Sequence, residues 1–150
     1  LLYFSGRWCP LCAHLDMLLY QVYADLKTMK EAHDIEAVCV SCDASEVAYN
    51  EHLGTLGLLA VAWDRSLIDD VMSAYDVEDL PVLLVLDAQD GTVLSRTGRS
   101  DVLEIMGKEH EMESEDDFGG AGHRRTSAGL LGRWLTLLSS YRKAEAESEE

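Results

Sequence analysis

The sequence predicts a single α/β domain in which helices flank a central mixed β-sheet. Short apolar runs typical of buried strands alternate with longer segments whose apolar residues recur at helical spacing. Strands joined through helices are expected to be parallel, whereas the last two predicted strands are joined by a hairpin turn and should be antiparallel. The 150 residues are enough to form one hydrophobic core.

The first half of the chain predicts strand, helix, strand, helix. Residues 1–5 (LLYFS) form an apolar run that ends at a glycine, as a buried strand does. From Leu11 onward, apolar residues follow a helical stripe about five turns long. Residues 35–41 (IEAVCVS) are rich in β-branched side chains and predict a second strand. The segment 43–46 (DASE) offers an Asp or Ser N-cap to a helix that ends near Leu56.

The next segment predicts a short helix followed by a β-hairpin. Residues 66–75 have the helical pattern and follow a connector, 58–64, that can itself be extended. Pro81 opens a continuous apolar strand. Asp90-Gly91 provides the hairpin turn, and residues 92–96 (TVLSR) are expected to pair back antiparallel.

The composition changes after Met106, and we divide the domain there. Residues 1–106 form the predicted core. Residues 107–127 are acidic and then glycine-rich, with five acidic residues in 111–117, and are expected to form a flexible insert. Residues 128–143 predict an amphipathic helix of the same domain, which would pack Trp134 into the core against the sheet. Residues 144–150 are expected to be a solvated acidic tail.

Charge and composition exclude two classes of partner. Twelve basic and 28 acidic residues give a net charge of −16, which repels phosphate backbones, so nucleic acid is not an expected partner. No apolar run approaches the ~20 residues of a membrane span, so the protein is expected to be soluble. Residue 1 is Leu, so we expect that the natural start of the chain has been lost. Four cysteines fit a reducing compartment, and we expect the cytoplasm.

The strongest chemical signal is the pair Cys9 and Cys12, which lies between the first strand and the first helix. Pro10 is favoured in a first helical turn, so Cys9 is expected just before the helix. Unpaired amide groups and the positive end of the helix dipole stabilise a thiolate there, and C-x-x-C cysteines in such positions titrate near ~7. Cys9 is therefore the expected nucleophile and Cys12 the expected resolving thiol.

Two other interpretations of the cysteines stay open from the residues alone. With Cys39 and Cys42, the pair makes a C-x2-C…C-x2-C pattern that resembles a zinc site. The 26-residue spacer is longer than usual, and Cys39 and Cys42 should point to opposite faces of a strand, so we expect no metal. Alternatively, Cys9 and Cys12 are small apolar core residues.

The segments LYFSGRWCPLC, VCVSCDAS and DVEDLPVLLVLDAQDGTVLSRTGR resemble the tryparedoxin and nucleoredoxin branch of the thioredoxin-like superfamily over residues 1–103. The resemblance implies a thioredoxin-like fold from which an N-terminal segment of the family is absent. Tyr3 stands where thioredoxin has a buried aspartate, as in the tryparedoxin pattern. Leu11 and Ala13 depart from the family's proline and arginine, and Arg7 could replace the lost positive charge.

The resemblance also implies the site. It makes Cys9 the nucleophile, Cys12 the resolving thiol and Pro81 a cis-proline that faces them. Other residues of the active-site rim are expected to be Trp8, Pro10, Leu80 and Arg99. Cys42 aligns close to the rim and is a candidate third redox thiol. His14 is expected to be a solvated helix residue, and the remaining histidines are expected at the surface: His33, His52, His110 and His123.

The implied function is thiol–disulfide oxidoreduction, in which the WCPLC dithiol reduces protein disulfides or peroxidases. No cofactor is expected beyond the Cys9–Cys12 disulfide, which an external dithiol such as trypanothione, or glutathione, or a reductase would restore. The expected partners are client proteins with disulfides, and the expected state is a monomer. The alternative is a redox-sensitive module that binds a protein partner with little turnover.

Overall fold

A five-stranded mixed sheet forms the centre of the computed structural model, which describes residues 1–112 and 121–148, with side chains described for 1–106 and 126–148. The strands lie in the order β3-β2-β1-β4-β5. Their bounds are β1 Leu2–Ser5, β2 Val38–Ser41, β3 Leu59–Ala60, β4 Val82–Leu86 and β5 Val93–Ser95. The first three strands are parallel, and β4 and β5 are antiparallel to their neighbours. This confirms the predicted thioredoxin-like mixed sheet.

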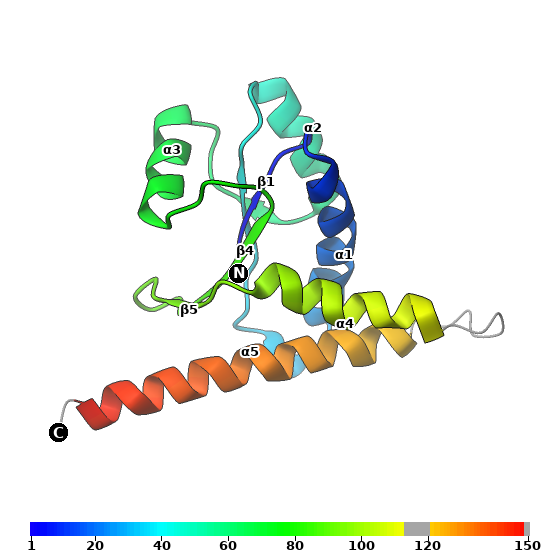
Figure 1. Ribbon diagram of the computed structural model, residues 1–150, viewed down its shortest axis with the longest axis vertical. Coiled ribbons are helices and arrows are strands. Elements are labelled where there is room, and N and C mark those ends of the chain that lie inside the picture. Colours follow the sequence, from blue (N-terminus) through cyan, green and yellow to red (C-terminus); the bar gives the residue numbers. More distant parts are fainter. Residues whose placement is uncertain (113–120, 149–150) are drawn as a thin grey trace.

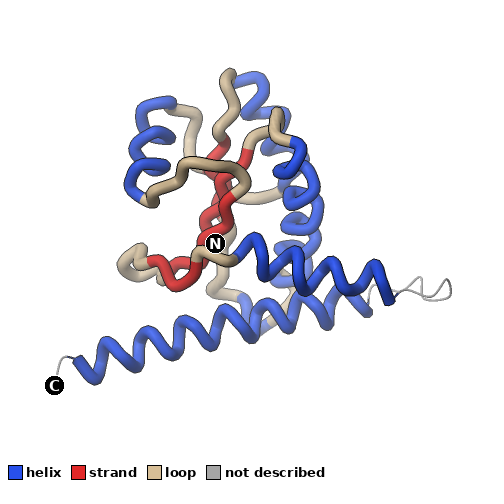
Figure 2. Tube along the Cα trace, viewed as in Figure 1, coloured by secondary structure: helices blue, strands red, loops and turns tan. Residues whose placement is uncertain are grey.

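Helices cover both faces of the sheet (Figures 1 and 2). Their bounds are α1 Pro10–Leu26, η1 Lys30–Ala32, α2 Glu46–Leu56, α3 Arg65–Ala74, α4 Gly98–Met112 and α5 Ala121–Ser148. Helix α3 lies on one side of the strands, with α1 and α2 on the other and α4 and α5 below them in this view. Among the described residues, none of these helices has the length and apolar character that crossing a membrane requires.

The alternation of side chains along each strand divides the core into two clusters. Tyr3, Cys39 and Leu83 point to the face covered by α1, α4 and α5, where they pack with Leu19 and Trp134. The neighbouring strand residues point to the opposite face, where they pack against α3 and the segment after it: Phe4, Val40 and Leu84. The register that pairs Tyr3 with both Cys39 and Leu83 keeps these side chains on one face.

Two turns have the local chemistry that the sequence predicts. Ser45 caps α2, with its hydroxyl accepting the amide hydrogen bond of Ala48 at 3.2 Å. The β4–β5 hairpin turns at Asp90-Gly91, where Gly91 has a φ of 78°, a conformation that favours glycine. Gly98 begins α4 directly against β4, because a Cβ atom at this position would lie 2.6 Å from the Leu83 carbonyl oxygen. The absence of a side chain lets the helix approach the sheet.

The C-terminal part of the chain differs from its prediction. A helix, α4, occupies Gly98–Met112 and was not predicted, and α5 already begins at Ala121. The prediction of a loop over 107–127 is therefore wrong at both ends, while 113–120 lie outside the described residues. The tail is exposed over residues 144–148, as predicted, but it is helical as far as Ser148, and residues 149–150 are not described. Good helix formers such as Lys, Glu and Ala extend a helix without any apolar face to bury.

Helix α5 packs mainly on helices rather than on the sheet, in contrast to the prediction. Trp134 is buried as predicted, and its indole N–H donates to Asp101 of α4 at 3.3 Å. Ser127, inside the segment expected to be flexible, is buried and donates to Asp25 of α1 at 2.8 Å. Near its far end, Arg142 forms two hydrogen bonds with buried Asp87 at the end of β4, at 3.0 and 3.1 Å. These polar contacts set the position of α5 along its length.

Candidate active site

The first two cysteines lie at the junction of β1 and α1, as predicted. Cys9 is the N-cap of α1, with Pro10 in the first turn. Its sulfur accepts a hydrogen bond from the amide of Cys12 at 3.3 Å, and the same amide donates to the Cys9 carbonyl oxygen at 3.1 Å. Cys9 thus stands at the start of the helix with an amide donor beside its sulfur.

The two thiols differ in exposure and in environment. Cys9 keeps 7% of its surface exposed and Cys12 none. Burial, together with a hydrogen bond to Cys9, raises the pKa of Cys12 to about 12. Cys12 therefore holds its proton at neutral pH, and only Cys9 combines a place at the surface with a place at the helix start. This asymmetry fits a nucleophile and a resolving thiol.

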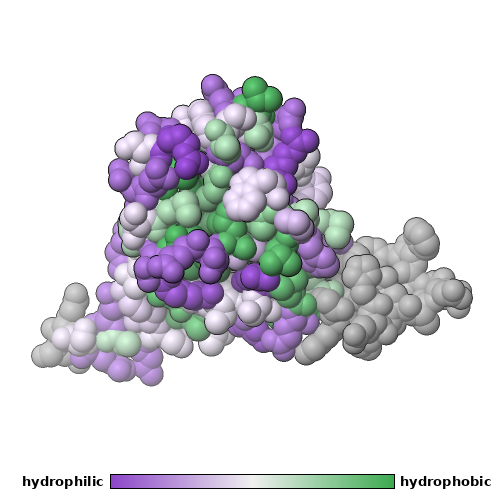
Figure 3. Space-filling model, turned by 45° about the horizontal axis from the view of Figure 1, so that its top comes forward, coloured by the Kyte–Doolittle hydropathy of each residue, from purple (hydrophilic) through white to green (hydrophobic). Residues whose placement is uncertain are grey.

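The predicted rim residues surround this junction. Trp8 is 65% exposed, and its indole N–H donates to the Cys42 carbonyl oxygen at 3.3 Å. The Leu80–Pro81 peptide bond is cis, as predicted. Phe4 pairs with Val82, so Pro81 lies opposite Ser5. This is the end of β1 from which the chain continues to Cys9. This end of the sheet is turned toward the viewer in Figure 3, where apolar residues are exposed between hydrophilic ones.

Three further predicted residues have clear positions. Pro10 is exposed, and Leu80 is partly exposed beside the cis bond. Arg99 lies in the first turn of α4 and, within the described part of the chain, no hydrogen bond or ion pair joins it to the cysteines. Arg7 forms an ion pair with Glu51 of α2, so its charge is partly neutralised there. Arg7 is therefore a weak substitute for the arginine that Ala13 replaces.

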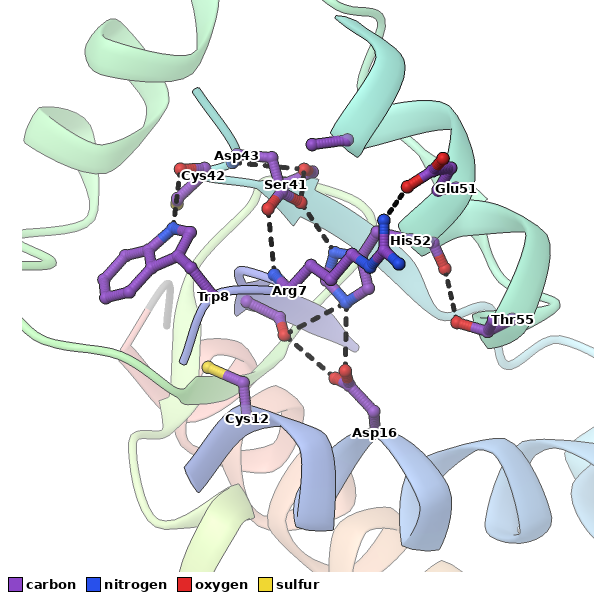
Figure 4. A network of polar contacts seen from close by, with 12 residues as sticks. Arg7, Trp8, Cys12, Asp16, Ser41, Cys42, Asp43, Glu51, His52 and Thr55 are labelled. Carbon is purple, nitrogen blue, oxygen red and sulfur yellow. Dashed lines mark hydrogen bonds and ion pairs between the residues drawn. The ribbon is translucent and has the colours of Figure 1, made fainter. Parts of the chain in front are cut away.

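A buried polar cluster lies behind the cysteines, and the sequence did not predict it (Figure 4). His52 is only 2% exposed, so its expected position at the surface is wrong. Its Nε2 lies 2.9 Å from Asp16 Oδ2, and its Nδ1 lies 2.9 Å from Asp43 Oδ2. Burial alone lowers the pKa of His52, but hydrogen bonds and charges from the two aspartates outweigh it and raise the pKa above its ordinary value. We call these three residues the Asp16–His52–Asp43 cluster.

Helical spacing in α2 was the signal that could have placed His52. The buried residues of this helix are Tyr49, His52 and Leu56, which share one stripe. A histidine on such a stripe is buried only where polar groups meet it, and Asp16 and Asp43 come from segments distant in sequence. The other predicted histidines fit or stay untested: His14 and His33 are exposed, while the side chains of His110 and His123 are not described.

The second cysteine pair has a different setting. Cys39 is fully buried in the cluster beneath α1, where burial raises its pKa. Cys42 is partly exposed, and its sulfur lies 3.6 Å from Met72 Sδ of α3, on the other side of the sheet. Desolvation raises the pKa of Cys42 to about 11. The two sulfurs face opposite sides, as predicted, and no group of three or more metal-ligating side chains forms within the described residues.

A C-x-x-C pair that caps the helix after the first strand, beside a cis-proline on the neighbouring strand, defines a thioredoxin-fold dithiol protein. A family model described as thioredoxin-like matches residues 1–93. The chain therefore belongs to the thioredoxin-like family, which is a family of thiol oxidoreductases.

Individual relatives agree with this assignment. Mouse nucleoredoxin is 34% identical over 102 residues, which make up 67% of this chain but only 23% of that protein. Tryparedoxin from Trypanosoma brucei brucei is 30% identical over 104 residues, 69% of this chain and 70% of that protein. The solved structure of tryparedoxin from Trypanosoma brucei has a TM-score of 0.61 and 30% identity, and covers 69% of this chain and 70% of that chain. The chain thus spans about a quarter of the length of the nucleoredoxins that it matches.

Proposed function

We propose that the protein is a thiol–disulfide oxidoreductase that uses the Cys9–Cys12 dithiol to reduce disulfides in other proteins. The observation that carries the proposal is the position of Cys9 as the N-cap of α1, within reach of Cys12. The thiolate is the attacking species in disulfide exchange, and amide donors at the start of a helix favour a negatively charged group there.

The exchange has two steps. Cys9 Sγ attacks a client disulfide, forming a mixed disulfide while the second client sulfur leaves as a thiolate. Cys12 Sγ then attacks Cys9 Sγ, which forms the Cys9–Cys12 disulfide and releases the reduced client sulfur. The two electrons gained by the client come from the two cysteines. An external dithiol such as trypanothione, or glutathione, or a reductase returns them, and no other cofactor is proposed.

The exposed apolar surface beside Cys9 supports a protein client. Trp8 and Leu11 are both more than half exposed on either side of the pair, and exposed aromatic and aliphatic side chains are typical of docking sites. We propose client proteins with disulfides, including peroxidases, for this surface. We also propose that the protein is a monomer that acts in the cytoplasm and has no nucleic-acid or membrane partners. This part of the proposal rests on composition and charge.

Insulin reduction followed by turbidity tests the proposal, with dithiothreitol or glutathione as reductant. Turnover that needs both Cys9 and Cys12 supports it. Client binding that depends on the redox state, without turnover, would instead support the redox-sensitive binding module, which Leu11 and Ala13 in place of the family's residues favour. Equilibrating the Cys9–Cys12 couple with glutathione measures its reduction potential. A potential well above that of the cytosolic glutathione pool indicates an oxidant or sensor rather than a reductase.

A further inference from the structure

The turn from Gly6 to Cys9 is held to the rest of the protein by few polar contacts. Within the turn, the Cys9 amide donates to the Gly6 carbonyl oxygen at 3.0 Å. Outside it, the Arg7 amide donates to Asp43 Oδ1 at 2.9 Å, and the Trp8 indole donates to the carbonyl oxygen of the residue before Asp43. Both acceptors follow directly after β2, so the position of the turn depends on how that segment is held.

Asp43 provides the buried anchor of the turn. It is 1% exposed, whereas the side chains of Arg7 and Glu51, which form the other charged contact of the turn, are more than half exposed. Screening and side-chain freedom weaken an exposed ion pair, while a buried carboxylate that accepts an amide hydrogen bond keeps its geometry. Trp8 follows the turn, because a Cβ atom on Gly6 would lie 2.7 Å from its indole nitrogen. Asp43 therefore fixes both the turn and the ring that lies against it.

His52 holds Asp43 on the side away from the turn. Its Nδ1 lies 2.9 Å from Asp43 Oδ2, which also accepts the Ser41 hydroxyl hydrogen bond at 2.7 Å. Oδ1 of Asp43 thus contacts the turn, and Oδ2 contacts β2 and α2. The other ring nitrogen of His52 lies 2.9 Å from Asp16 of α1. A single imidazole ring therefore joins α1, α2 and the anchor of the turn (Figure 4).

The donors and acceptors around His52 favour its charged form. Ionised carboxylates accept hydrogen bonds and donate none. Asp16 is already placed as an acceptor, since the hydroxyls of Tyr3 and Ser5 donate to its Oδ1 at 2.6 and 2.9 Å. With Asp16 on one side and Asp43 on the other, both ring nitrogens must donate, which only the imidazolium can do. Without this proton, a ring lone pair faces one of the carboxylates.

We propose that His52 and Asp43 are positioning residues for the nucleophile: charged His52 fixes Asp43, and Asp43 fixes the turn that presents Trp8 and Cys9 to a disulfide. This inference rests on the proposed exchange at Cys9 and deepens it by adding two residues that touch neither the reacting sulfurs nor the client. The turn should be held less firmly once His52 loses its proton. This loss occurs above the ordinary range, because the pKa of His52 is raised in the fold.

The other groups near the ring leave the two aspartates as its charged contacts. The uncharged Ser5 hydroxyl of β1 lies 3.5 Å from Nε2. The Arg7–Glu51 pair lines the groove between α1 and α2 beside His52, and its two charges offset each other. Arg65 of α3 donates to the Asp43 carbonyl oxygen and is paired with Asp69. The remaining titratable groups close to the cluster have a raised pKa and stay protonated at neutral pH: Tyr3, Cys12 and Cys39.

The rate at which Cys9 attacks 5,5′-dithiobis(2-nitrobenzoate) tests the positioning. A Cys12→Ser, Cys42→Ser background leaves Cys39 as the other thiol, and Cys39 is fully buried. Asp43→Ala removes the anchor and should slow the release of coloured thiolate by about tenfold or more, since a displacement of about 1 Å can cost about a hundredfold in rate. Asp43→Asn keeps an oxygen for the Arg7 amide and can donate to neutral His52, so it should retain the parent rate.

Two further variants make this test specific. His52→Gln offers the aspartates one donor nitrogen in place of two, so its rate should lie between those of the parent and Asp43→Ala. Asp87→Ala is the matched control. Asp87 is 2% exposed, accepts the Gln89 amide at 2.9 Å and is bonded by Arg142, but it lies at the opposite end of the sheet from Cys9. Asp87→Ala should lower stability and leave the Cys9 rate unchanged.

The Arg7 amide proton gives a readout that a merely structural role of Asp43 would not move. NMR follows its shift against pH in Cys9→Ser protein, which lacks the neighbouring thiol. An amide proton bonded to a carboxylate resonates downfield, so the shift reports the bond to Asp43. It should move with the same midpoint as the His52 ring protons, above about pH 6.5, and should lose this titration in His52→Gln. This measurement also covers the case in which Asp43→Ala does not fold.

Two results would overturn the inference. One is an equal Cys9 rate in folded Asp43→Ala and the parent protein, and the other is an Arg7 amide that does not follow the titration of His52. If the wild-type protein does not reduce insulin while both readouts behave as expected, the proposed function fails and the positioning stands. If wild type and Asp43→Ala reduce insulin equally, with equal Cys9 rates, the exchange stands and the positioning fails.

Discussion

Two pairs of cysteines with the same C-x2-C spacing lie in this protein, and they have opposite chemical character. Cys9 caps α1 and Cys12 lies in its first turn, where the Cys12 amide donates to the Cys9 sulfur at 3.3 Å. Cys39 and Cys42 lie in and just after a strand, which sends Cys39 into the core and Cys42 toward Met72. Spacing alone therefore says little about a cysteine pair, because the backbone between the two residues decides whether they meet.

The largest difference between the pairs should be seen in turnover. Cys9→Ser and Cys12→Ser should each abolish insulin reduction, while Cys42→Ser should retain it. Only Cys12→Ser should accumulate mixed disulfides with clients, since it keeps the attacking thiolate and loses the resolving step. Non-reducing gels and mass spectrometry measure the adducts. Equal trapping through Cys12 in the Cys9→Ser variant would reverse the assignment of nucleophile and resolving thiol.

Alkylation should separate the four thiols next. At pH 7 a thiol with a pKa of about 11 is ionised to only about 10⁻⁴, compared with about 3% for an unperturbed thiol, so Cys42 should react about three hundredfold more slowly than a free cysteine. Its rate should rise about tenfold per pH unit. Iodoacetamide should label Cys9 first and leave Cys12 and Cys39 protected, as peptide mapping would show. Labelling of Cys42 ahead of Cys9 would instead support Cys42 as a redox thiol.

Substitutions of the two cysteines in the second pair should differ in their effect on the stability of the fold. Cys39→Ser places a hydroxyl without a built-in partner in the core and should lower the free energy of unfolding by about 1–3 kcal/mol. Cys42→Ser, at a partly exposed position, should change it by less than about 0.5 kcal/mol. Urea denaturation followed by fluorescence measures both. If the two substitutions cost the same, the difference in burial between these cysteines has no energetic consequence.

The smallest expected effect concerns the polar surroundings of the first pair. Because the pKa of His52 is raised in the fold, its protonation stabilises the folded state fully below its unfolded value near 6.5, and this contribution is lost as pH rises through the folded pKa. His52→Gln should therefore be most destabilising at about pH 6 and less so at higher pH. His33→Gln is the control, since His33 is exposed beside Asp34. A constant difference between His52→Gln and wild type across this pH range would contradict a charged His52.

The parts of the protein that the sequence predicted correctly depend on residues close together in the chain. The start of α1 follows from Cys9 and Pro10 in adjacent positions, and the hairpin follows from Asp90-Gly91 between two apolar runs. The α2 cap at Ser45 is equally local. Each involves backbone groups within a few residues, where propensity and hydrogen bonding are decided locally.

The errors concern residues whose partners are distant. His52 was expected at the surface because neither Asp16 nor Asp43 is near it in sequence. Helix α4 was missed and residues 107–127 were assigned to a loop, because their composition lacks an apolar stripe. Yet Ser127 meets Asp25, 102 residues earlier in the chain. The composition of a segment indicates how much apolar surface it can bury by itself. It does not indicate which distant residues the fold brings into contact with that segment.

The sequence by itself determined the order of the main strands and helices as far as the β4–β5 hairpin, the thioredoxin-like family and the identity of the dithiol, because hydrophobic period, turn residues and the C-x-x-C motif act over short distances. Only the tertiary structure decided which of these side chains meet: that Asp16 and His52 approach each other across α1 and α2, that Cys42 contacts α3, and that α5 lies on helices. The physical reason is that burying a polar group requires a hydrogen-bond partner, and in this protein those partners come from distant segments.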